Sequence, residues 1–123
     1  MTILNLTPHD LTILAKDGVE KSGPTLVADA ASAVVLRTIP RSGQVARVSV
    51  SHVDAEPIDG IPTQATTYGQ VVDLPEPADG VFYVVSGLVK SAATERSDLL
   101  VPGGQVRCRD NASKILGCLA LNR

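Results

Sequence analysis

Short apolar runs, separated by glycine and proline, recur along the whole chain. Period-two alternation in residues 44–53 places Ala46, Val48, Val50 and His52 on one face of a strand. The most apolar run, residues 81–86, is expected to be a central strand. Other runs with strand or extended character occupy residues 2–6, 10–15, 61–80, 105–110 and 114–121. The pattern therefore predicts a mainly β protein.

Helical character is confined to a small part of the sequence. Residues 87–96 are the best helix candidate, whereas the alanine-rich residues 26–36 fit a strand or a helix. Gly and Pro predict a hairpin or loop at residues 16–24, a turn at 41–43, and a break at 102–104 that opens the last strand pair. We expect one α+β domain, residues 1–123, built as a β-sandwich or curved antiparallel sheet with one or two short helices.

Composition limits what this domain can bury. The chain has 123 residues, of which 44% are hydrophobic, so a folded domain with a modest core is expected rather than disorder. The aromatic residues are only Tyr68, Phe82 and Tyr83, so the core must consist of aliphatic side chains. A small core together with exposed strand edges predicts a homo-oligomer.

The charge is small overall and unevenly distributed. A formal net charge of −2 argues against a binder of double-stranded nucleic acid. Residues 1–80 hold five Lys or Arg against ten Asp or Glu, whereas residues 81–123 hold six against three. An anion site is therefore expected in the C-terminal part.

Motifs for catalysis, metal binding or membrane insertion are not apparent. The start of the chain lacks the pattern of a secretory signal, and no apolar run is long enough to span a bilayer, which favours a cytoplasmic location without membrane contact. Phosphate-binding loops, dinucleotide fingerprints and nucleophile elbows are missing.

Cys108 and Cys118 are expected to be reduced thiols, and His9 and His52 are too few to predict a metal site. We expect binding rather than turnover, without a cofactor, and we expect Asn5 and Thr7 to pin the turn at Pro8.

The candidate ligand-binding residues are arginines and one aromatic. Arg107 and Arg109 share one face of a strand, and the planar fork of arginine suits phosphate groups. Phe82 and Tyr83 point to opposite faces of their strand, so one of them can stack on a base while the other packs in the core. The alternative is that the two arginines lie on a solvated strand face and that Phe82 is a core residue.

Several segments together resemble a known family. The runs NLTPH (5–9), IPRSGQVARV (39–48), TTYGQVVDLPEP (66–77), VFYVVSGLV (81–89) and SDLLVPG (97–103) occur in the order seen in a family of small phage and prophage proteins. That family is similar to, or includes, the Thoeris anti-defence one sponges. These proteins sequester cyclic ADP-ribose-type signals, made by bacterial TIR-domain enzymes, without cleaving them. The resemblance covers nearly the whole chain and implies a β-rich oligomer with ligand pockets between protomers.

The resemblance also implies roles for individual residues. Phe82 would stack on the base, Arg109 would bind the pyrophosphate and Asp110 a ribose hydroxyl. The run VRCRD departs from the plainer VRD pattern of the family, so Arg107 is an alternative to Arg109. Further phosphate candidates are Arg47 and Arg96. Two other functions stay open: a phage structural or assembly protein that binds no small molecule, and a small nucleotide-processing enzyme.

Overall fold

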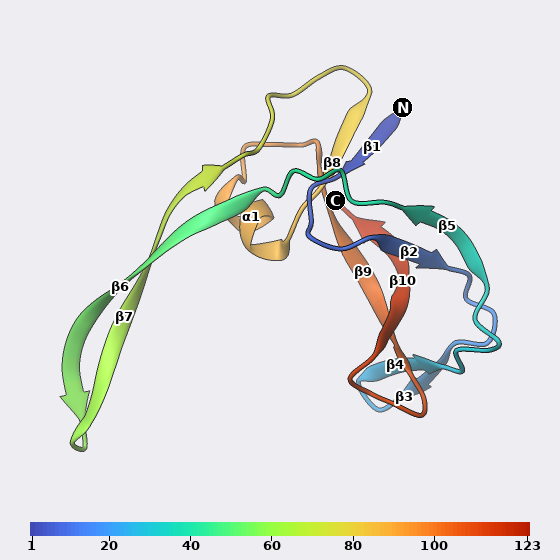
Figure 1. Ribbon diagram of the computed structural model, residues 1–123, viewed down its shortest axis with the longest axis horizontal. Helices are drawn as coiled ribbons and strands as arrows, with labels where there is room; N and C mark the ends of the chain where they lie inside the picture. The colour runs from blue at the N-terminus through green and yellow to red at the C-terminus, as the bar shows by residue number, and fades with distance from the viewer.

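The computed structural model describes residues 1–123 and confirms a mainly β fold with one short helix (Figure 1). Eight strands form one sheet, and two further strands form a separate hairpin. The main path of the sheet runs through β1 (Thr2–Asn5), β8 (Val81–Val84), β9 (Leu99–Cys108), β10 (Ile115–Asn122), β2 (Leu11–Leu14) and β5 (Val35–Ile39). Off this path, β4 (Thr25–Ala28) pairs with β9, and β3 (Glu20–Ser22) pairs with β4.

The sheet is mixed, whereas the sequence suggested antiparallel pairing. Parallel pairs join β1 to β8, β8 to β9, β4 to β9 and β10 to β2. Parallel neighbours need a long crossover, and the connection from β8 to β9 contains the helix α1 (Gly87–Ala92). The helix was expected at residues 87–96 and is shorter; the Ser86 hydroxyl caps its start by accepting the Val89 N–H.

The sheet curls until its two ends meet, in agreement with the curved arrangement expected. Arg41, just beyond β5, forms a parallel bridge with Asn5 at the end of β1. The Ser42 N–H donates to the Asn5 carbonyl oxygen at 2.9 Å. The first and fifth strands are thereby joined, and the strands between them curve around a common interior.

Asn5 holds this junction together from a buried position. Its side-chain amide donates to the carbonyl oxygens of His9 (2.8 Å) and Ile39 (3.1 Å). Its side-chain oxygen accepts hydrogen bonds from the Thr7 N–H and the Thr7 hydroxyl. The expected pinning of the Pro8 turn by Asn5 and Thr7 is confirmed, and the contact with Ile39 extends it to a distant strand.

Two parts of the chain differ in detail from the expectation. The ambiguous residues 26–36 contain the end of β4, a turn and the start of β5, and no helix. Strand β9 runs through Pro102-Gly103-Gly104, so the break predicted there was wrong. Pairing with β8 ends at Leu100, and two glycines follow: a Cβ at Gly103 would clash with the Asn122 side chain, and Gly104 has a φ of +67°.

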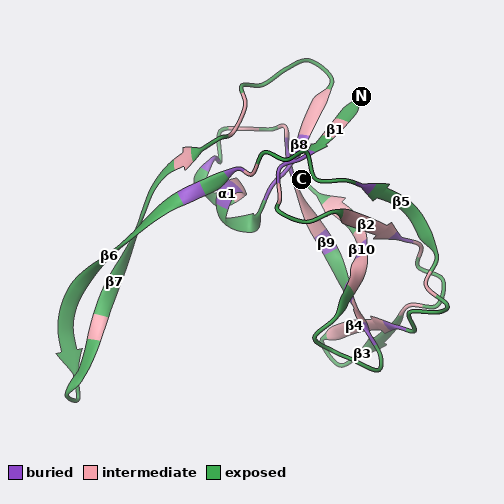
Figure 2. Cartoon of the chain, viewed as in Figure 1, coloured by how far each residue is buried: buried purple, intermediate pink, exposed green.

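The core is small and aliphatic, with 18 of 123 residues buried (Figure 2). The larger cluster lies between α1, the β8–β9 part of the sheet and the root of the hairpin, and consists of Leu6, Ala46, Val48, Tyr83, Val85, Val89, Ala93 and Leu99. The smaller cluster lies under β4 and β9 and consists of Leu14, Ala28 and Val106.

The strands β6 (Arg47–Ile58) and β7 (Ile61–Val72) form a long hairpin that projects from the body, and we call it the arm (Figures 1 and 2). Asp59 and Gly60 close its tip, both with positive φ, as in the two-residue turns that best match strand twist. Ala46 and Val48 are buried at its root, but Val50, which follows on the same alternation, is 47% exposed. Beyond the root, both faces of the arm lie in solvent.

Candidate functional site

Phe82 lines a hollow on the face of β8 that points away from α1. The expectation that Phe82 and Tyr83 lie on opposite faces is confirmed, because Tyr83 belongs to the larger core cluster, whereas Phe82 is only half-buried. The hollow has a volume of about 260 Å³ and is lined by Met1, Ile3, Arg37, Phe82, Leu100 and Arg123. The strand register brings Ile3 beside Phe82, so apolar walls flank the ring.

Two arginines that sequence reasoning missed accompany Phe82. The guanidinium of Arg123 lies over the Phe82 ring, 5.4 Å from its centroid, and Arg37 reaches the hollow from β5. Neither forms an ion pair, since the acid-paired arginines of the chain are Arg96 and Arg109. In the sequence, Arg37 is marked only as the single cation of the apolar run 34–39. Arg37 lies near Phe82 only because the sheet curls and joins the ends of β1 and β5.

Arg96 is committed to the framework rather than to a ligand. Its guanidinium makes two 2.8 Å hydrogen bonds to the Asp98 carboxylate and a third, of 2.9 Å, to the Pro75 carbonyl oxygen. It also lies 6.0 Å from the centroid of the Tyr83 ring. With three hydrogen bonds of its guanidinium already made, Arg96 fastens the segment before β8 to the core, and its expected role as a phosphate ligand has no support in this geometry.

The Arg96–Asp98 pair should make the free energy of unfolding depend on pH. Hydrogen bonding from Arg96 holds the pKa of Asp98 below its ordinary value, so the folded state binds this proton more weakly than the unfolded state. The stabilisation is therefore complete above the ordinary aspartate pKa and is lost as the pH falls through the folded-state pKa. Urea denaturation between pH 7 and pH 3 should show a loss of up to about 1 kcal/mol that Asp98→Asn lacks. Parallel pH profiles for the two proteins would contradict this.

Arg109 lies far from Phe82 in the same chain. Tyr83, next to Phe82, pairs with Leu99 at the start of β9, whereas Arg109 follows the end of that strand. The separation along the strand is roughly 30 Å. Arg109 pairs with Asp29 (3.0 Å) and Glu20 (3.2 Å), and hydrogen bonding to Glu20, then to Asp29, raises its pKa.

The remaining predicted ligand residues are also dispersed. Arg107 donates to the Ala112 carbonyl oxygen at 2.9 Å and so braces the loop between β9 and β10. Asp110 is exposed in that loop, and Arg47 is exposed at the root of the arm. One copy of the chain therefore does not bring Phe82, Arg109 and Asp110 together in one pocket.

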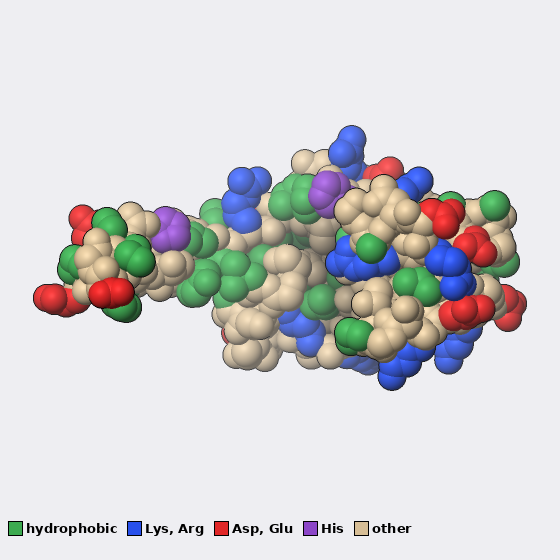
Figure 3. All heavy atoms as spheres, turned by 90° about the horizontal axis from the view of Figure 1, so that it is seen from below, with side chains coloured by type: hydrophobic (Ala, Val, Ile, Leu, Met, Phe, Trp, Pro, Cys, Tyr) green, Lys and Arg blue, Asp and Glu red, His purple; other side chains and the backbone are tan.

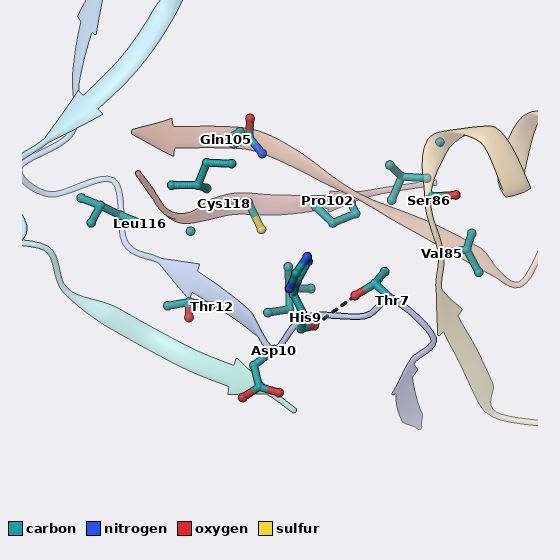
Figure 4. A pocket seen from close by; sticks show the side chains of 15 residues that line it. Thr7, His9, Asp10, Thr12, Val85, Ser86, Pro102, Gln105, Leu116 and Cys118 are labelled. Carbon is teal, nitrogen blue, oxygen red and sulfur yellow. Dashed lines mark hydrogen bonds between the residues drawn. The ribbon is translucent and has the colours of Figure 1, made fainter. Parts of the chain in front are cut away.

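A larger cavity, of about 490 Å³, lies between β2, β9 and β10 (Figure 4). Its polar lining comes from Thr7, His9, Asp10, Thr12, Ser86, Gln105 and Cys118. It contains no Lys or Arg, and one Asp10 carboxylate oxygen already accepts the Arg41 N–H at 3.0 Å. The cavity therefore offers no cation for a phosphate group.

The nucleophile candidates in this cavity are not activated. The Ser86 hydroxyl accepts the Val89 N–H as helix cap, and burial raises the pKa of the Cys118 thiol. Cys108 and Cys118 are buried free thiols on neighbouring strands. His9 lines the cavity, whereas His52 lies on the arm and is hydrogen-bonded to Thr66. No group of three metal-ligating side chains is present.

No protein-family model, curated protein or solved structure matches this chain. The one helix has six residues and is too short to cross a bilayer. The Phe82 hollow therefore provides the chemistry from which a function is inferred.

Proposed function

We propose that this protein binds a cyclic ADP-ribose-type nucleotide at the Phe82 hollow and sequesters it intact, in the cytoplasm of an infected or lysogenic bacterium. The observation that best supports this is the half-buried Phe82 ring, which is flanked by Arg37 and Arg123. Neither arginine is paired with an acidic group. A purine stacks on such a ring for about 1–3 kcal/mol, and guanidinium groups bind pyrophosphate oxygens through paired hydrogen bonds.

Arg123 must change its position when a base binds. Its guanidinium covers the ring that the base would use. Exposed cation–π contacts contribute only about 0.5–1 kcal/mol, so a stacked purine together with an Arg123–phosphate contact outweighs the contact that is lost. Arg123 would then move from the ring to the phosphate, and Arg37 would approach the same anion from β5.

The size of the hollow suggests that a second copy completes the site. A volume of about 260 Å³ lies below the range of roughly 300–1,000 Å³ that is usual for ligand pockets. A ligand of the size of cyclic ADP-ribose would therefore extend beyond the hollow of one copy. This agrees with pockets between protomers, as the resemblance implies.

Calorimetry with cyclic ADP-ribose tests the proposal. Phe82→Leu keeps an apolar side chain but removes the flat ring, and should weaken binding by about 1–3 kcal/mol. Arg37→Ala and Arg123→Ala should each weaken it about tenfold or more, because each removes a charged hydrogen bond. Tyr68→Leu on the arm, an exposed aromatic away from the hollow, is the matched control and should leave the affinity unchanged.

Arg109→Ala separates two versions of the site. Because Arg109 is ion-paired at the other end of β9, we expect wild-type affinity. A loss as large as that of Phe82→Leu would instead place Arg109 of a second copy on the phosphate. Heat release followed by chromatography should return unchanged nucleotide; an altered nucleotide would indicate an enzyme, and an absence of binding would reject the proposal.

The arm favours a second candidate function. A long, exposed hairpin is a common device for joining copies of a chain, so a phage structural or assembly protein that binds no small molecule is the alternative. This alternative predicts a melting temperature that no nucleotide changes.

A further inference from the structure

The arm is not a stable element by itself. An isolated two-stranded hairpin is marginal in water, and stable sheets need a third strand or a packed face. Between residues 50 and 68 the arm has no buried residue, and Val53 at its centre is 56% exposed. The large apolar side chains exposed along the arm are Val50, Val53, Ile58, Ile61, Tyr68 and Val72.

Between residues 51 and 67, one face of the arm is free of charge. The register pairs Ser51 with Thr67, Val53 with Ala65 and Ala55 with Thr63, and alternation places all six on one side. We call this set the neutral face. The opposite side carries Val50, His52, Asp54, Gln64, Thr66 and Tyr68. The short side chains of the neutral face let another surface approach closely.

The hydroxyl groups of the neutral face already have partners. The Ser51 and Thr67 hydroxyls bond to one another across the strands, and the Thr63 hydroxyl donates to the Glu56 carbonyl oxygen at 2.6 Å. Because these polar groups are already hydrogen-bonded within the arm, removing water from them costs little free energy. The face can therefore be buried without leaving unpaired donors or acceptors.

The surface area of the chain is large enough to include an interface. The accessible surface is 8054 Å² for 12.8 kDa. A compact single-chain protein of this mass exposes about 6,300 Å², so the excess is about 1,800 Å². Stable complexes bury about 800 Å² on each partner. One chain therefore displays more than enough surface for an interface with its own copies.

Charge favours the body of another copy as the contact surface. Residues 48–72 contain Asp54, Glu56 and Asp59 and no Lys or Arg, whereas residues 81–123 have a surplus of cations. Figure 3 shows acidic groups toward the end of the arm, whereas the body carries the Lys and Arg side chains together with further acidic groups. The acidic arm would be repelled by an anionic membrane and by a second arm lying alongside with its tip in the same direction.

We propose that the neutral face is an assembly surface, buried against a second copy of this chain. The expected wild-type mass in light scattering is a multiple of 12.8 kDa at micromolar concentration. The decisive comparison is Val53→Asp against His52→Asp. Both variants add the same charge to adjacent positions of one strand, but on opposite faces.

Val53→Asp should raise the dissociation constant about tenfold to a hundredfold, because the carboxylate would be buried without a partner. His52→Asp should leave the wild-type mass unchanged. A wild-type mass of one chain, or equal behaviour of the two variants, would overturn the proposal.

A shortened arm keeps the proposal testable if Val53→Asp fails to fold. Residues 51–67 are replaced by Asp-Gly, which joins the paired residues Val50 and Tyr68 with the turn that closes the native tip. The buried root at Ala46 and Val48 is retained. We expect a folded protein with the mass of one chain, and persistence of the wild-type mass would overturn the proposal.

Discussion

Tyr83→Ala should lower the free energy of unfolding by about 3–5 kcal/mol, whereas Phe82→Ala should lower it by only about 1–2 kcal/mol. Tyr83 is 4% exposed, packs in the larger core cluster and donates its hydroxyl to the Glu76 carbonyl oxygen at 3.2 Å. Its truncation opens a cavity and leaves that acceptor without its donor. Phe82 keeps part of its ring in a hollow, so less buried surface is lost. Urea denaturation at pH 7 measures both changes.

Tyr83→Phe is the matched control for this pair. It retains the ring and removes only the hydroxyl, and should lower the free energy of unfolding by about 1 kcal/mol. Equal losses for Tyr83→Ala and Phe82→Ala would show that both rings are core residues. That result would remove the base-stacking role proposed for Phe82.

Asn5→Ala should lower the free energy of unfolding by about 2–4 kcal/mol. The side chain is 1% exposed and makes four hydrogen bonds, two of them as donor to backbone carbonyl oxygens. Each buried group left without a partner costs about 1–3 kcal/mol. Asn5→Asp should be at least as harmful, because it places carboxylate oxygen against the His9 and Ile39 carbonyls. Thermal and urea denaturation report these losses.

Thr7→Val tests whether the effect belongs to Asn5 or to the turn as a whole. It removes the Thr7 hydroxyl but leaves the Thr7 N–H bonded to Asn5, so we expect a loss of about 1 kcal/mol. If Asn5→Ala stayed within 1 kcal/mol of wild type while Thr7→Val did not, the junction between β1 and β5 would not depend on Asn5.

Local signals in the sequence were sufficient for several of the elements. Apolar runs identified β1, β2, β8 and β10, and the opposite orientation of Phe82 and Tyr83 followed from strand alternation. The hydrogen-bonded turn at Asn5 and Thr7 was predicted from the chemistry of Asn and Thr next to proline. These features depend on neighbours in sequence, which is why the pattern contained them.

Features that depend on distant partners could not be read from the pattern. The alternation through Ala46, Val48 and Val50 is continuous, yet the core ends after Val48. Arg109 resembled a free phosphate ligand because its partners, Asp29 and Glu20, lie about 80 residues earlier in the chain. Arg37 joins Phe82 only through the curl of the sheet. Two of the three groups assigned to the candidate site, Arg37 and Arg123, were therefore not found from local sequence.

The parallel pairs of the sheet have a consequence for synthesis on the ribosome. Thr2 pairs with Val81 and Leu26 with Val106, so β1 and β4 each wait for a strand about 80 residues later. At translation rates of roughly 5–20 residues per second, that wait is roughly 4–16 s. The arm, by contrast, closes around a two-residue turn, and such hairpins form in about 1–10 μs. After the arm ends at Val72, Val81 follows within roughly 0.5–2 s and Val106 within roughly 2–7 s. The nascent chain therefore displays its arm before β1 and β4 acquire their partners, while those two strands keep unpaired edges open to chaperones.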